Sequence, residues 1–120
     1  MRCCYVAVAL IALGTPCLGY AQETGRLVDC RLEGARGKVE FVGKCRLLRE
    51  RGGSFTLENV DRKQPLFDTV VSVSVSIISP GIAQVRGLTS GGINARGEPA
   101  RRSKNGPACW VGKDFKVCAR

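Results

Sequence analysis

The sequence predicts a mainly β fold: a small antiparallel sheet, sandwich or partly open barrel, stapled by two disulfides. Apolar residues and serines alternate strictly from Val71 to Ile77, the pattern of a strand with one buried and one exposed face. No segment shows the apolar period of an amphipathic helix. Four cysteines remain after an N-terminal leader, and an even number in a short exported chain indicates a disulfide framework.

The first 21 residues have the order of a secretory signal peptide. Arg2 precedes an apolar run from Tyr5 to Leu13, and a glycine and a proline break that run before small residues lead to Ala21. An uncleaved anchor is the alternative, but the run is shorter than the roughly 20 residues that span a bilayer. We therefore expect cleavage after Ala21, a periplasmic or secreted location, and a single β domain over residues 22–120 without a transmembrane segment.

Two alternating segments predict the first hairpin, with turn residues between them at 34–38. In the first segment the inward positions are Val28, Cys30 and Leu32. In the second segment the inward positions are Val39, Phe41, Gly43, Cys45 and Leu47. A further turn at residues 51–54 leads into a strand that directs Phe55 and Leu57 inward.

The stretch that alternates most strictly places apolar side chains on one face and three serines on the other. The apolar face carries Val71, Val73, Val75 and Ile77. A turn at residues 79–81 leads to the next strand. A loop with an odd number of residues puts Val85 on the valine face and Arg86 on the serine face, whereas an even loop would bury Arg86. We expect the odd loop, and a serine face shared with Gln84 that is solvated rather than ligand-binding.

Between Thr89 and Pro107 no strand pattern remains, so we expect a basic loop over residues 89–107. Long loops are commonly functional or disordered, and both interpretations stay open. Guanidinium groups bind phosphate or carboxylate through paired hydrogen bonds. The candidate anion-binding residues are Arg96, Arg101, Arg102 and Lys104.

The last thirteen residues, "ACWVGKDFKVCAR", predict a second hairpin with a two-residue loop at Lys113-Asp114. This register sets Cys109 opposite Cys118 and Trp110 opposite Val117. It also sets Gly112 opposite Phe115, where the glycine leaves room for the aromatic ring.

Four of the seven cysteines lie after the leader: Cys30, Cys45, Cys109 and Cys118. We favour the pairs Cys30–Cys45 and Cys109–Cys118 because each lies within one predicted hairpin, while the two long-range connectivities stay open. A metal site is disfavoured because the chain has no histidine and no Cys-x-x-Cys pair. No metal and no cofactor are expected.

The early cysteine hairpin, Gly53-Ser54-Phe55 and the terminal block resemble small exported four-cysteine proteins of alphaproteobacteria that end in an "ACWVG…VCA" hairpin. The most specific part is Cys109-Trp110-Val111 together with Val117-Cys118-Ala119. The resemblance covers most of residues 22–120. It implies a periplasmic or secreted location and implies no activity.

The net charge and the absence of histidine limit the classes of function that the chain can have. Without Arg2 the chain keeps 18 Lys and Arg against 10 acids, a net charge of +8 that attracts polyanions or serves solubility. Without histidine the usual general base is missing. Glu33 and Glu40 are expected on the exposed side beside Arg31 and Lys38, as charge pairs rather than as a catalytic pair.

We therefore expect a non-enzymatic exported binding protein that contacts an anionic envelope component or an acidic protein. An inhibitor of an envelope-directed hydrolase is the alternative. A basic nucleic-acid-binding β domain is disfavoured because such domains stack bases on exposed aromatic residues, and Phe41 and Phe55 are expected to point inward.

Overall fold

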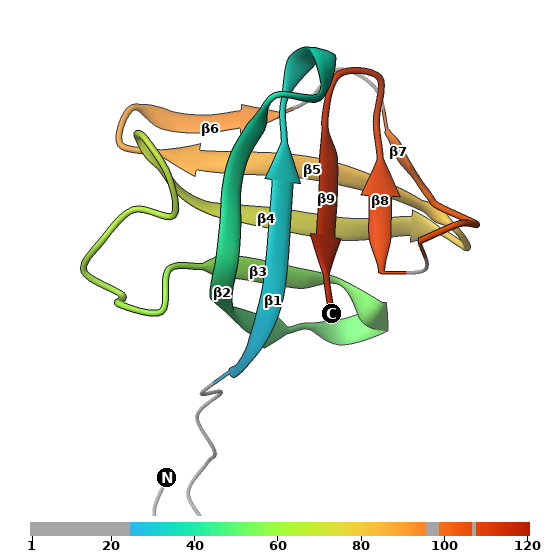
Figure 1. Cartoon of the computed structure of the whole chain (residues 1–120). Helices are drawn as coiled ribbons and strands as arrows, with labels where there is room; N and C mark the ends of the chain where they lie inside the picture. The colour runs from blue at the N-terminus through green and yellow to red at the C-terminus, as the bar shows by residue number, and fades with distance from the viewer. Residues whose placement is uncertain (1–24, 96–98, 107) are drawn as a thin grey trace, which may run out of the picture.

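The computed structural model describes residues 25–95, 99–106 and 108–120 (Figure 1). The expected signal peptide lies outside the described residues. The strands are β1 (Arg26–Glu33), β2 (Val39–Arg49), β3 (Phe55–Glu58), β4 (Val70–Ser79), β5 (Ile82–Thr89), β6 (Gly92–Ala95), β7 (Ala100–Arg102), β8 (Cys109–Val111) and β9 (Lys116–Ala119). Two short 3₁₀ turns, η1 (Ala35–Gly37) and η2 (Arg51–Gly53), follow β1 and β2. No helix in these ranges is long and apolar enough to cross a membrane.

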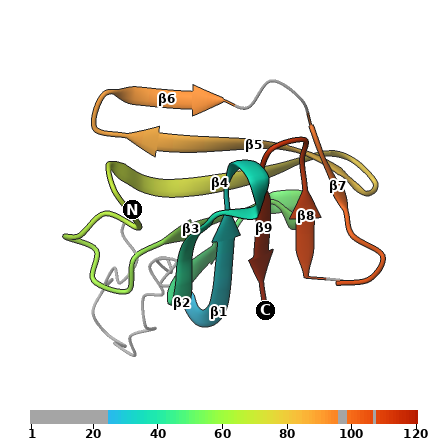
Figure 2. The ribbon, with the colours of Figure 1, turned by 45° about the horizontal axis from the view of Figure 1, so that its top comes forward.

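The strands form a closed antiparallel barrel, which confirms the mainly β prediction. Their order around the ring is β4-β3-β2-β1-β9-β8-β7-β5, and pairing of β5 with β4 completes it. In Figure 1, β1, β2, β8 and β9 run across β4 and β5, which lie behind them. β6 pairs with β5 outside this ring, on the side away from β4 (Figure 2).

The two local disulfides are confirmed. On β1 and β2, Val28 lies opposite Cys45 and Cys30 opposite Gly43, so the Cys30–Cys45 bridge runs diagonally between the strands inside the barrel. Both of these cysteines are buried. Cys109 and Cys118 lie directly opposite each other on β8 and β9 and are bonded.

Two of the inward positions expected from strict alternation are wrong. Val39 is 44% exposed because the register shifts between Leu32 and Glu33, so that Glu33 pairs with Val39. Val71 is 39% exposed because a second shift separates Val70 from Ser72. A bulge adds a residue to one strand, which changes the side chains that face the core beyond it.

The expected register of the β4–β5 hairpin is confirmed. Val75 lies opposite Val85, and Ser74 lies opposite Arg86 on the outer face. The hairpin turns at two residues, and Ile78 is an additional unpaired residue in β4. A two-residue turn plus one bulged residue gives the odd count that keeps Arg86 out of the core.

Residues 89–107 are not a loop throughout. They contain β6, which pairs with the second half of β5. They also contain β7, which pairs with Ile82 and Ala83 in the first half of β5. β7 also pairs with β8, so it lies between β5 and β8 in the ring of strands. Ala100 of β7 is fully buried, which makes this short strand part of the core.

Candidate functional site

Among the predicted anion-binding residues, the structure separates Arg101 and Arg102 onto the two faces of β7. Arg96 lies outside the described residues. Arg101 and Arg102 are exposed neighbours on β7, and consecutive residues of a strand point to opposite faces. Arg101 lies opposite Val111 on the outer face, whereas Arg102 is opposite Trp110.

Arg102 is positioned by an aromatic ring. Its guanidinium carbon lies 5.3 Å from the ring centroid of Trp110, within the range of a cation–π contact. Trp110 is only 5% exposed and packs in the core. The ring therefore gives Arg102 a rigid support at one end of the barrel.

Lys104 is exposed in the segment that follows β7. The Ser103 hydroxyl accepts hydrogen bonds from the backbone N–H groups of Asn105 (3.2 Å) and Gly106 (3.1 Å). The N–H of Cys109 donates to the Gly106 carbonyl at 2.8 Å. This turn carries no acidic residue, and in the described ranges no salt bridge engages Arg101 or Lys104.

A cavity of about 160 Å³ opens at the other end of β5, and the sequence analysis did not predict it. Its apolar lining comes from Leu32 of β1, Val70 and Val73 of β4, Val85 of β5, Val117 of β9, Phe67 and Phe115. Charged residues also border it: Glu33, Glu40, Arg86 and Lys116. The cavity is an apolar space with a charged rim at one end of the barrel.

Three features of the strands lie around this cavity. The bulge beside Glu33 removes the Val39 side chain from the core, and the bulge at Val71 removes the Val71 side chain. Gly87 lies opposite Val73 in an inward register and contributes no side chain at all. Bulges and strand glycines are common at barrel rims and binding sites for this reason.

The segment between β3 and β4 closes one side of the cavity. Its Leu66 is buried in the core and Phe67 lines the cavity. The Arg46 Nη2 atom donates to the Val60 carbonyl at 3.1 Å, and the Asn59 amide donates to the Pro65 carbonyl at 2.9 Å. No pattern in the sequence predicted that this segment reaches the core.

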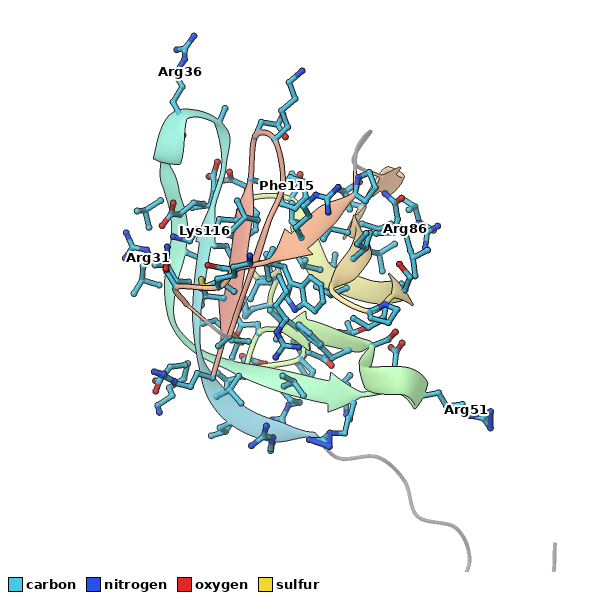
Figure 3. All side chains as sticks on the ribbon, turned by 90° about the vertical axis from the view of Figure 1, so that its right-hand side faces the viewer. Arg31, Arg36, Arg51, Arg86, Phe115 and Lys116 are labelled. Atoms are coloured by element: carbon cyan, nitrogen blue, oxygen red, sulfur yellow. A yellow bond between two sulfur atoms is a disulfide. The ribbon has the colours of Figure 1, made fainter. Side chains whose placement is uncertain are left out.

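The carboxylate of Glu33 is the best defined charge on the rim. Arg31 Nε donates to it at 2.7 Å, and Glu33 lies opposite Lys116. The hydrogen bond from Arg31, aided by the charge of Lys116, lowers the pKa of Glu33. In Figure 3, Arg31 and Lys116 lie on one side of Phe115 and Arg86 on the other.

In the described ranges no three carboxylate or cysteine side chains gather closely enough to hold a metal ion.

No family model matches this sequence, and no curated protein or solved structure is significantly similar to it. A function must therefore be inferred from the residues of the chain itself.

Proposed function

We propose that the protein is an exported, non-enzymatic binding protein that holds an anionic envelope component or an acidic protein. Arg101, Arg102 and Lys104 make the contact, with Arg96 as a further member of the set. The observation that carries the proposal is the described segment 99–106, where Arg101, Arg102 and Lys104 are all exposed and Arg102 rests on Trp110.

The position of these cations favours a broad anionic surface over a small ion. Arg101 and Arg102 leave β7 on opposite faces, so the two guanidinium groups do not converge on one phosphate. A polymer or an acidic protein surface can contact both edges of the strand. The two disulfides support a location outside the reducing cytosol.

Retention of the oxidised protein on three immobilised anions tests the proposal. The panel is a lipopolysaccharide-type glycolipid, peptidoglycan and DNA, each at low and high salt. We expect selective retention on one of the envelope components that falls with salt, because contacts between exposed charges are screened. The double substitution Arg101→Ser with Lys104→Ser should abolish it.

The matched control removes the same charge elsewhere. Arg49→Ser with Arg51→Ser changes two exposed cations at the end of β2 and in η2. Equal loss in both double variants would show that net charge alone causes retention. Tight binding to a hydrolase would instead support the inhibitor hypothesis if that binding persisted at high salt.

A further inference from the structure

We propose that the open end of the barrel is a second binding site, which takes the apolar group of a small organic acid. A single aromatic ring, or an acyl chain of similar volume, matches the space, since an apolar cavity of about 150 Å³ binds benzene. This site lies along the second half of β5, whereas β7 pairs with the first half. It therefore does not depend on Arg101 or Lys104.

The two ends of the interior are packed differently. Beside β7 the core is filled, because Ala83 of β5 and Ala100 of β7 lie opposite each other and are both fully buried. At the other end two bulges and Gly87 leave the space of about 160 Å³. An unfilled space of this kind lowers stability, because its lining loses packing contacts. A bound ligand supplies those contacts.

The lining selects an apolar group. Seven of the residues around the cavity are Leu, Val or Phe, and the described part of the chain buries no polar or charged residue. Water inside such a cavity finds few hydrogen-bond partners, so an apolar group can displace it readily. Phe67 and Phe115 add aromatic faces against which a ring can pack.

The charges on the rim favour an acid over an amine. Glu33 is already engaged by Arg31 at 2.7 Å and lies opposite Lys116. Arg86 forms no salt bridge with the described acids. The remaining rim acid, Glu40, forms no salt bridge with the described cations, so Arg31, Arg86 and Lys116 outnumber the two acids, Glu33 and Glu40. The field of a chain with formal net charge +9 also concentrates anions.

Titration of the oxidised protein with benzoate, followed by methyl NMR, tests the site directly. An aromatic ring in the cavity should shift the methyl signals of Leu32, Val73, Val85 and Val117. The methyls of Ala83 and Ala100, which are fully buried beside β7 and do not line the cavity, should stay in place. Absence of shifts at millimolar benzoate and hexanoate, or equal shifts in both groups, would overturn the proposal.

Two neighbouring valines provide a matched pair of variants. Val70→Phe fills the cavity, whereas Val71→Phe makes the same change on an exposed bulge residue that does not line it. We expect Val70→Phe to weaken benzoate binding about tenfold or more and Val71→Phe to change it less than about twofold. Equal effects would contradict the site. If Val70→Phe unfolds the protein, Val73→Phe repeats the test at the residue that lies opposite Gly87.

Head-group choice is tested with ligands of equal chain length. Hexanoate should bind more tightly than hexylamine, and Arg86→Ser should weaken hexanoate while leaving hexanol unchanged. Tighter binding of hexylamine would overturn the assignment to an acid.

Discussion

The ring of Phe115 occupies the space that a side chain at Gly112 would need. A Cβ atom at Gly112 would lie 2.1 Å from the Cε1 atom of this ring, which is itself buried in the core. The backbone of the two residues is joined by a hydrogen bond from the Gly112 N–H to the Phe115 carbonyl at 2.9 Å. The β8–β9 turn and the cavity wall are thus built from one contact.

Gly112→Ala should therefore destabilise the protein by about 1–3 kcal/mol, because the ring must move off its site. Urea unfolding measures the change. Gly91→Ala is the control, since its nearest neighbour would be the Thr89 hydroxyl at 3.8 Å. Equal free energies of unfolding for the two variants would show that the ring moves without cost.

The two disulfides should differ in their access to reductant in the folded protein. Cys45 is fully buried and Cys30 nearly so, while Cys109 and Cys118 are partly exposed on the outer face. Mild dithiothreitol followed by alkylation and mass spectrometry should label Cys109 and Cys118 first. Simultaneous labelling of all four cysteines would mean that reduction requires global unfolding.

Ionised Glu33 should stabilise the fold at neutral pH. Its pKa is lowered in the folded state by the Arg31 hydrogen bond, so its contribution is present above the unfolded pKa and is lost as pH falls through the folded pKa. Glu33→Gln should accordingly lower the Tm at pH 7, and its difference from the wild type should shrink as pH falls through the folded pKa of Glu33.

Arg31 provides the control for this pH dependence. Arg31→Gln should produce a loss of similar pH dependence, and the double variant should lose little more than either single variant because the two side chains share one contact. High salt should reduce all of these differences. A Glu33→Gln effect that does not shrink as the pH is lowered would show that packing, and not charge, is its cause.

Leu66 should anchor the segment between β3 and β4. It is 3% exposed, so Leu66→Ala should cost about 2–5 kcal/mol and loosen the wall that carries Phe67. Leu27→Ala, at a side chain 55% exposed, should change stability by less than about 0.5 kcal/mol. Thermal unfolding compares the two, and similar losses would contradict the anchoring role.

The parts of the fold that the sequence predicted are those set by short-range alternation. Both cysteine pairs lie in hairpins, where the spacing of apolar residues determines which side chains meet. The opposition of Val75 and Val85 was predictable for the same reason, because any other parity would have buried Arg86.

The errors arise where one residue is added to a strand. Val39 and Val71 carry the side chains that alternation assigns to the core, yet bulges turn both outward. Bulges follow from the curvature that a closed barrel demands of its strands, which no local pattern contains. The cavity was missed with them, because it exists only where both bulges and Gly87 meet in space.

β7 was missed because it is short and one of its two partners, β5, is separated from it in the chain by β6. Only three residues long, it pairs with Ile82 and Ala83 on one side and with β8 on the other. The sequence suggested that its arginines lie together in a loop, but the strand places them on two opposite faces. The candidate site was therefore predicted in composition and not in arrangement.

The pairing of β1 with β9 has a consequence for how the chain acquires its shape. Cys30 to Glu33 lie opposite Lys116 to Ala119, and Asp29 exchanges two backbone hydrogen bonds with Arg120. A chain that emerges with its N-terminus first can form the β1–β2 hairpin early, but one edge of β1 stays bare until β9 follows. Unpaired edges promote aggregation, and contacts this distant in sequence form slowly. The arrival of β9, and not the formation of either hairpin, should set the pace at which the barrel closes.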